Sequence, residues 1–198
     1  MENTNKKPKT FAVPGNTVSV FCYEWFEMIA QCFVIVVFVM SFFFRLFTVD
    51  GTSMENTFKH RDKVIVQKSN YTPSNGDVVV IKPYRDLTEP IIKRVIATED
   101  QEFSIDSNLN VRVNNVLIPE TYIKEKMHDL VTGSEPTDIL PKVPHGYSFV
   151  MGDNRNYSLD SRYAEVGYVD NKYIVGRVRY IYFPFFRIRS IVTPNFWG

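Results

Sequence analysis

The stretch "IIKRVIAT", from Ile91 to Thr98, shows the pattern that decides the fold of this chain. Its β-branched residues predict a strand, in which successive side chains alternate between two faces. Lys93 then shares one face with Ile91 and Val95, whereas Arg94 lies on the other. Two interpretations of Lys93 stay open: a charge at a sheet edge that extends to water, or an amine buried among aliphatic side chains.

Similar segments rich in Val, Ile, Tyr and Phe recur along the chain between turn signals. The stretch 101–145 is more polar and indicates an insertion, within which 119–130 is a modest helical candidate. We therefore predict a mostly-β protein, with an antiparallel core sheet built from 46–100 and 146–198 and a smaller β-rich subdomain inserted between them. The other expected strands are 63–68, 77–82, 110–118, 147–152 and 173–183.

One long apolar run, Met28 to Phe44, precedes these strands and predicts a single transmembrane helix over 25–45. A buried core helix is disfavoured because the run has no polar face. A cleaved signal peptide is disfavoured because no small-x-small site follows the run. Residues 1–24 are interpreted as a polar cytoplasmic tail with an interfacial segment.

The orientation of this anchor rests on weak signals. Basic residues occur on both sides of the apolar run, so the positive-inside rule is close to a tie. The domain that follows the anchor contains no cysteine, which favours the outside slightly. We expect a single-pass cell-membrane protein with a cytoplasmic N-terminus and its folded domain on the outer face.

Charge and metal-binding residues exclude two other classes of function. The formal net charge is +1 over 198 residues, which provides no basic field for nucleic acid. Both cysteines, Cys22 and Cys32, lie in or beside the apolar run, and the three histidines are scattered. No structural zinc site is predicted, and no cofactor is required.

A second stretch, "VDGTSMENTF" from Val49 to Phe58, places Ser53 in a turn shortly after the anchor. Such a serine is either an ordinary turn residue or a nucleophile that needs a base. No histidine has a suggestive neighbourhood for a classical triad. Lys93 is the remaining candidate, because burial that lowers a lysine pKa from about 10.4 to about 8 raises its neutral fraction at pH 7 to about a tenth.

The third stretch is "GDNRNYSLDSR", Gly152 to Arg162, which is densely polar directly after an expected strand. It is either a solvated loop or a support for the Ser/Lys pair. A calcium loop is disfavoured because Arg155 stands where an acceptor is needed. In the supporting interpretation, Ser158 hydrogen-bonds Lys93, and the charged residues of the loop pair with one another.

Together these stretches resemble the boxes of type I signal peptidases of the Gram-positive kind, peptidase S26 type. The family pattern Ser-Met-x-Pro-Thr-Leu is matched with Asn56 in place of proline and Phe58 in place of leucine. The Lys-Arg-Val-Ile-Gly box is matched with Ala97 in place of glycine. The box Gly-Asp-Asn-Arg-x-x-Ser-x-Asp-Ser-Arg is complete, and this long motif is the most specific. The matching segments are 53–58, 76–79, 93–96 and 152–162.

The resemblance implies a membrane-bound serine endopeptidase with Ser53 as nucleophile, Lys93 as general base and Ser158 orienting the lysine. The backbone N–H of Ser53 would contribute to the oxyanion hole. Gly51 stands where some members carry a second hydroxyl donor. Structural support is assigned to Asp153, Arg155, Asp160, Arg162 and Arg94.

The implied substrates are signal peptides of secretory preproteins, cut after small-x-small sites beside the lipid bilayer. Met54 and Ile91 are the candidate pocket residues. An alternative is a non-catalytic or substrate-dedicated membrane-tethered factor of the same fold that serves surface pilus assembly, with pilin precursors as partners. The C-terminal stretch 183–198 is either an edge strand with a packed tail or a contact with the membrane interface.

Overall fold

The computed structural model describes residues 17–68, 71–129 and 142–197. The chain divides into two compact units, Met1–Ser41 and Phe42–Gly198. Most of the tail predicted over 1–24 and part of the predicted insertion lie outside the described residues. Each unit is described by itself.

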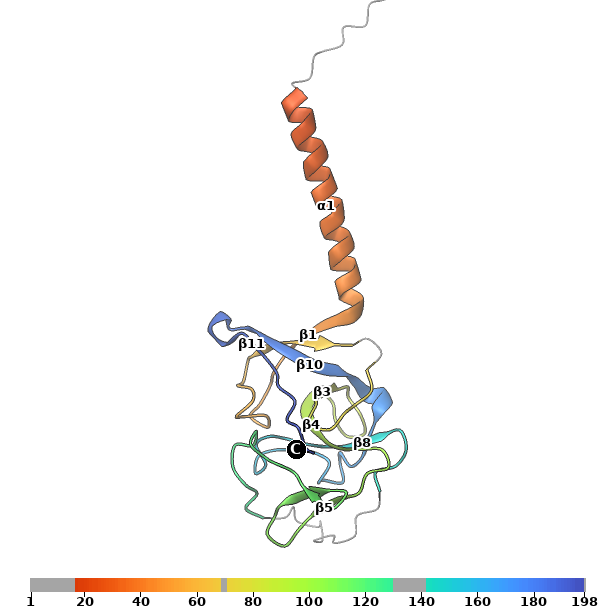
Figure 1. Ribbon diagram of the computed structural model, residues 1–198, viewed down its shortest axis with the longest axis vertical. Coiled ribbons are helices and arrows are strands. Elements are labelled where there is room, and N and C mark those ends of the chain that lie inside the picture. Colours follow the sequence, from red (N-terminus) through yellow and green to blue (C-terminus); the bar gives the residue numbers. More distant parts are fainter. Residues whose placement is uncertain (1–16, 69–70, 130–141, 198) are drawn as a thin grey trace, which may run out of the picture. The chain divides into compact units, whose positions relative to one another are not determined.

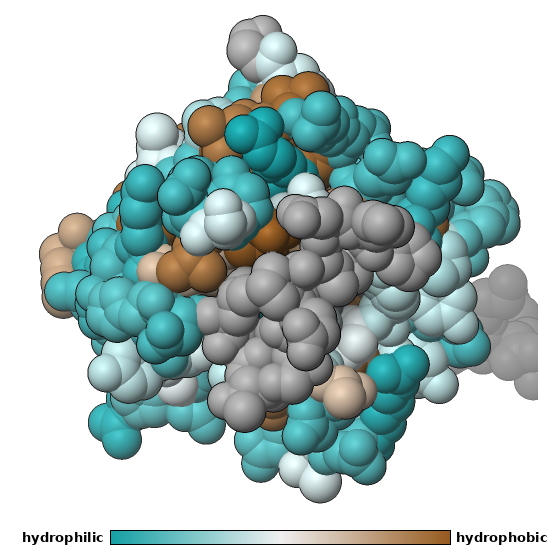
Figure 2. All heavy atoms as spheres, turned by 90° about the horizontal axis from the view of Figure 1, so that it is seen from below, coloured by the Kyte–Doolittle hydropathy of each residue, from teal (hydrophilic) through white to brown (hydrophobic). Residues whose placement is uncertain are grey.

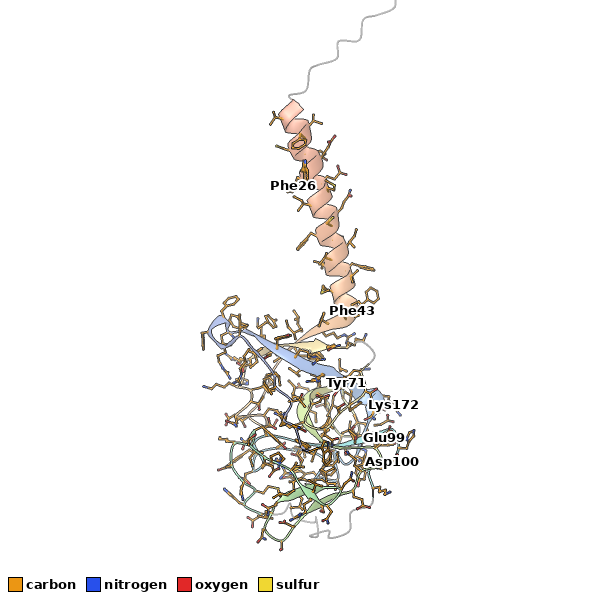
Figure 3. All side chains as sticks on the ribbon, viewed as in Figure 1. Phe26, Phe43, Tyr71, Glu99, Asp100 and Lys172 are labelled. Atoms are coloured by element: carbon orange, nitrogen blue, oxygen red, sulfur yellow. The ribbon has the colours of Figure 1, made fainter. Side chains whose placement is uncertain are left out.

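The first unit consists, in its described part, of the helix α1 (Thr17–Phe43), which ends in the first residues of the second unit. Apolar side chains project from all around the helix, among them Phe26 and Phe43 (Figure 3). Its section Val18–Phe43 is long and apolar enough to cross a membrane, and none of that section is buried against protein. A helix that is apolar all round suits lipid rather than a soluble surface, so its length and composition fit a membrane anchor.

The second unit is built on an antiparallel sheet in the order β1-β2-β10-β3-β4-β8-β9, with β11 paired to β10. Its long strand β10 runs between β2 and β3 (Figure 1). Of the two interpretations of Lys93, the one that places it at a sheet edge is wrong, because β4 lies between β3 and β8. The strands are β1 (Phe44–Thr48), β2 (Lys63–Gln67), β3 (Val78–Ile81), β4 (Ile91–Thr98), β8 (Tyr147–Met151), β9 (Val169–Asp170), β10 (Ile174–Phe183) and β11 (Arg189–Ser190).

A smaller sheet of three strands, β5-β6-β7, lies within the predicted insertion. Phe103 and Val111 of this sheet pack in one apolar cluster with Ile96 of β4 and Phe149 of β8. The small sheet therefore shares a core with one end of the large one. Its strands are β5 (Phe103–Ile105), β6 (Val111–Val113) and β7 (Val116–Leu117), and two short 3-10 helices, η1 (Asn171–Tyr173) and η2 (Phe185–Arg187), flank β10.

The mostly-β prediction with one N-terminal apolar helix is confirmed, whereas two local expectations are not. No helix forms over the described residues 119–129, where the chain instead makes turns. The anchor helix begins well before residue 25 and ends at Phe43, so that Arg45 belongs to β1. The face of the protein in Figure 2 is mostly hydrophilic, as expected for a domain that meets water.

Candidate active site

Ser53 lies in the loop between β1 and β2, and the base of that loop is closed by backbone hydrogen bonds between Val49 and the segment 61–62. Around Ser53 the chain turns tightly, with Glu55 N donating to Thr52 O at 3.0 Å. Met54, only 2% exposed, packs in the apolar core beneath the turn. This burial fixes the turn and leaves the Ser53 side chain at a pocket.

Lys93 reaches Ser53 from the middle of the large sheet. Its partner across the β3–β4 ladder is Val79, and only 3% of Lys93 is exposed. The Lys93 Nζ and Ser53 Oγ atoms are 2.7 Å apart. The structure thus brings together two residues that are 40 positions apart in the sequence, at hydrogen-bonding distance.

The charge of Lys93 is destabilised by its surroundings. Burial lowers the pKa of the Lys93 amine from its ordinary 10.5 to about 8, although the carboxylates of Asp160 and Asp153 act in the opposite direction. The hydrogen-bond partner found for its Nζ is the hydroxyl of Ser53, with no carboxylate within ion-pair distance among the described residues. A fraction of this amine is therefore neutral near pH 7, and a neutral amine can accept the serine proton.

The predicted hydrogen bond between Ser158 and Lys93 is absent. The Ser158 side chain is buried, but its Oγ has no hydrogen-bond partner among the described residues. It packs instead against Gly152: a Cβ atom added there would lie 2.2 Å from Ser158 Oγ and 2.5 Å from Ser53 O. Any side chain at position 152 would therefore displace both serines.

The loop Gly152–Arg162 is held by its own charges, partly as predicted. Asp160 accepts hydrogen bonds from Gly152 N at 2.9 Å and from Arg162 Nε at 2.8 Å. Arg162 also donates to Arg155 O, and Arg155 donates to Gly152 O. Arg155 forms its ion pair with Glu120 of the insertion, which the sequence did not indicate.

Arg94 and Asp153 form a buried ion pair on the opposite face of β4 from Lys93. Two nitrogens of the Arg94 guanidinium donate to the two Asp153 carboxylate oxygens, at 2.8 and 2.6 Å. A third donates to Gly76 O, and the guanidinium lies 4.2 Å from the centre of the Tyr122 ring. Thr57 also hydrogen-bonds Asp153, so the pair joins the nucleophile loop to the loop that begins at Gly152.

Asp77, in the second matching segment, has a comparable structural place. Its buried carboxylate accepts a hydrogen bond from Tyr71 Oη at 2.7 Å and lies 3.0 Å from Arg177 Nε. Thr193 donates to it as well. Tyr71 is labelled in Figure 3; burial and the Asp77 carboxylate raise the pKa of its phenol. These contacts tie the start of β3 to β10 and the C-terminal tail.

The backbone N–H of Ser53 is available to stabilise a developing negative charge. No acceptor for the Ser53 N–H occurs among the described residues. The N–H of Gly51, by contrast, donates to His60 Nδ1 at 3.3 Å. Gly51, assigned to oxyanion support by the resemblance, therefore contributes neither a side chain nor a free N–H, and Ser53 N–H is the donor left in place.

A pocket of about 180 Å³ opens beside the Ser/Lys pair. Its lining includes the apolar side chains of Phe47, Val80 and Ile91 together with Ser53 and Lys93. Ile91 is thus placed as the sequence suggested. Met54 is not: it lies in the core cluster beneath the turn, since the turn directs its side chain inwards.

Asn56 has a backbone conformation that is incompatible with the proline of the family pattern. Its backbone φ is 91°, which the proline ring cannot adopt. Its side-chain Nδ2 donates to the carbonyls of Tyr122 and Ile123, at 2.9 and 3.1 Å. Asn56 therefore holds the insertion against the nucleophile loop. Ala97, another departure from the family pattern, is fully buried in the cluster shared with the small sheet.

Sequence reasoning missed several residues that build the site. Asn154, Thr57, Glu120 and Tyr122 were assigned no role. Asn154 and Thr57 lie inside matching motifs, so the motifs themselves were the available signal. Nothing in the sequence around Glu120 or Tyr122 indicated their contacts, because those contacts depend on how the insertion folds back.

Comparisons with known proteins identify the family of this chain. Residues 22–183 match the family described as signal peptidase, peptidase S26. Signal peptidase I of Bacillus licheniformis is 30% identical over 195 residues, covering 96% of this chain and 97% of the relative. Signal peptidase IB of Staphylococcus aureus is 31% identical over 186 residues, covering 87% and 95%.

A solved structure of a signal peptidase I from Enterococcus faecalis covers 55% of this chain and 98% of its own, at 25% identity and a TM-score of 0.44. The family match and the sequence relatives show the family of this chain. The chain belongs to the signal peptidase family, peptidase S26, and is an enzyme of that family.

Proposed function

We propose that this protein removes signal peptides from exported preproteins with Ser53 as nucleophile and Lys93 as general base. The observation that carries the proposal is the 2.7 Å contact between Ser53 Oγ and the buried Lys93 amine. Family membership supports the reaction class, and the lowered pKa of Lys93 supports the choice of base.

The reaction proceeds in two steps. Neutral Lys93 takes the hydroxyl proton of Ser53 while Oγ attacks the scissile carbonyl carbon, and the Ser53 N–H donates to the resulting oxyanion. The intermediate collapses as Lys93 gives its proton to the leaving amine, which leaves an acyl-enzyme ester. Water then attacks the ester while Lys93 accepts the water proton. As this second tetrahedral intermediate collapses, Lys93 returns the proton to Ser53 Oγ and the acyl product leaves as a carboxylic acid.

The substrate lies extended in the pocket beside the pair. Two chain segments contribute to the lining of this pocket: the first includes Thr48 and Asp50, and the second includes Glu89, Pro90 and Ile91. A chain bound between these two segments presents a carbonyl to Ser53 and alternate side chains to the apolar wall. In this proposal the bonds cut follow small-x-small sites, as the resemblance to the family implies.

The same proposal places the enzyme in the cell membrane, with α1 as anchor, the N-terminus in the cytoplasm and the catalytic domain outside. Ser53 follows Arg45 by only eight positions, which limits their separation to about 28 Å. Exposed apolar side chains near the C-terminus, Phe185 and Phe186, stand beside Arg187 and suit contact with lipid. Protease accessibility on intact cells tests the orientation, because an outer domain is cut and an inner one is protected.

Cleavage of a detergent-solubilised precursor tests the pair. Ser53→Ala and Lys93→Ala should each lower cleavage by about 10³-fold or more, since each removes an essential reacting group. Ser107→Ala and Lys172→Ala change an exposed serine and an exposed lysine and serve as matched controls with near-normal cleavage. Retention of activity by either site variant contradicts the mechanism.

The alternative of a non-catalytic pilus-assembly factor is disfavoured because both reactive residues are present and in contact. A peptidase dedicated to pilin precursors uses the same site and differs only in substrate range. Cleavage of a panel of secretory and pilin precursors separates the two: a general enzyme cuts most of them, and a dedicated one cuts only the pilins.

A further inference from the structure

Asn154 contacts both peptide units that flank Ser53. Its backbone N–H donates to Ser53 O at 3.0 Å, and its side-chain Nδ2 donates to Thr52 O at 3.1 Å. Asn154 is 1% exposed, so neither contact competes with bulk water. One residue of the Gly152–Arg162 loop therefore holds the nucleophile turn at two successive carbonyls.

The second of these contacts bears on the oxyanion donor. Thr52 C=O and Ser53 N–H belong to one planar trans peptide, so they point in opposite directions. The Thr52 oxygen accepts from Asn154 Nδ2 on one side and from Glu55 N, at 3.0 Å, within the turn. Holding this oxygen therefore also sets the direction of the Ser53 N–H, which has no acceptor of its own among the described residues.

The backbone contact forms with any residue at 154, whereas the side-chain contact needs a donor of asparagine length. The amide oxygen of the same side chain does not stabilise the fold, because Asn154 Oδ1 is buried without a hydrogen-bond partner among the described residues. A buried acceptor of this kind is destabilising. Stability alone thus does not account for an asparagine here, and its Nδ2 contact with Thr52 does.

We propose that Asn154 is a positioning residue, which aims the Ser53 N–H at the oxyanion through the Thr52 carbonyl. This inference rests on the proposed role of Ser53 as nucleophile. It assigns Asn154 no contact with substrate and no proton transfer.

The test compares Asn154→Leu, which keeps the branching at Cγ and the number of side-chain heavy atoms but has no donor, with Asn156→Ala as a matched control. Asn156 belongs to the same loop, and its amide binds Glu125 and Lys126 of the insertion instead of the nucleophile turn. We expect kcat of Asn154→Leu to fall about 10- to 100-fold, less than complete loss of an oxyanion donor, with KM changed by less than about threefold. The control keeps a near-normal kcat.

Two inhibitors separate positioning from general damage. A peptide aldehyde forms a tetrahedral adduct whose oxygen occupies the oxyanion site, so its Ki should rise in proportion to the loss of kcat/KM. A reduced-amide peptide of the same sequence has no carbonyl at that position, and its Ki should stay unchanged. The apparent pKa of the rate profile should also stay unchanged, because no contact between Asn154 and Lys93 is present among the described hydrogen bonds.

A folded Asn154→Leu protein with normal kcat overturns the inference. So does an equal loss of affinity for both inhibitors, which indicates a distorted pocket. Should the leucine variant not fold, as judged by thermal unfolding, Asn154→Ala provides the same measurements with the same expected pattern. These outcomes differ from failure of the mechanism itself, in which Ser53→Ala retains activity.

Discussion

The two faces of β4 carry neighbouring cations, Lys93 and Arg94, that are treated in opposite ways. Both are buried, at 3% and 1% exposure. Arg94 has a carboxylate, a carbonyl, a hydroxyl and an aromatic ring around its guanidinium. Lys93 has the Ser53 hydroxyl.

The difference teaches how one strand can hold a permanent charge and a titrating one. A buried charge is tolerated when it is paired and hydrogen-bonded, which is the case for Arg94. Without such a partner the charged form is destabilised and the pKa falls, which is the case for Lys93. The guanidinium face supports the fold, and the amine face carries the proposed base.

Replacement of Lys93 by arginine should abolish cleavage almost completely. Arginine keeps its proton at any working pH, so Lys93→Arg should lower cleavage by about 10³-fold or more. The measurement is precursor cleavage in detergent, with the exposed Lys63→Arg as matched control. Substantial activity in Lys93→Arg, with the fold intact, contradicts a proton-accepting role for this residue.

Removal of the Arg94 guanidinium, on the other face of β4, should destabilise the fold. Arg94→Met leaves the Asp153 carboxylate buried without its cation, and we expect the free energy of unfolding to fall by about 3–5 kcal/mol. Urea unfolding of the full chain in detergent measures it. The control is Arg112→Met, which removes a more exposed pair with Asp106 and should change stability by less than about 1 kcal/mol. Similar losses in the two variants contradict the contrast.

Replacement of Lys93 by an apolar residue should instead stabilise the protein. The folded pKa of about 8 lies below the ordinary 10.5, so the unfolded chain holds the proton more tightly. The destabilisation of the folded state by Lys93 is therefore complete below pH 8 and disappears as the pH rises to 10.5. Lys93→Met should gain up to about 3 kcal/mol of unfolding free energy at pH 7, from 1.36 kcal/mol per pKa unit.

Unfolding measured at pH 7, 9 and 10.5 tests both the sign and the window. Ser53→Ala is the control, because it inactivates the enzyme and leaves the amine in place. A Lys93→Met protein that is less stable than the parent at pH 7 contradicts the view that the buried amine destabilises the fold.

The pH–rate profile tests the same group in the active enzyme. Because the neutral amine is the base, kcat/KM should rise about tenfold per pH unit below pH 8 and level off above it. Cleavage of a soluble peptide substrate from pH 6 to 10 measures this profile. A rise that continues to pH 10 indicates a lysine with an ordinary pKa and contradicts the burial argument.

The sequence predicted the features that depend on local pattern. Val- and Ile-rich segments placed most strands of the large sheet, and the all-apolar run placed the anchor. The Ser/Lys pair was predictable because no histidine offered an alternative base and because long motifs matched. These signals lie in residue type and spacing, which a chain shows before it folds.

Other parts of the site depend on how distant segments meet. The Glu120–Arg155 ion pair and the contact of Tyr122 with Arg94 arise because the insertion folds back onto the catalytic loops. The Ser158 hydroxyl was expected on Lys93 but packs against Gly152, which only the backbone path decides. The left-handed φ of Asn56 likewise became visible only in the turn itself.

The smallest expected effect concerns Asn56, which links the nucleophile loop to the segment that carries Tyr122 on the Arg94 face. Asn56→Gly retains the positive φ at no steric cost and removes only the side-chain bonds to Tyr122 O and Ile123 O. We expect a loss of about 1 kcal/mol of unfolding free energy, the net worth of such hydrogen bonds.

Asn56→Ala should lose more, because alanine is strained at a φ of 91°. Urea unfolding of both variants gives the difference. Equal stability of the two variants contradicts the strained turn. If Asn56→Gly loses as much unfolding free energy as Arg94→Met, the contacts of the insertion, and not the Arg94–Asp153 ion pair, chiefly stabilise the face of β4 that carries Arg94.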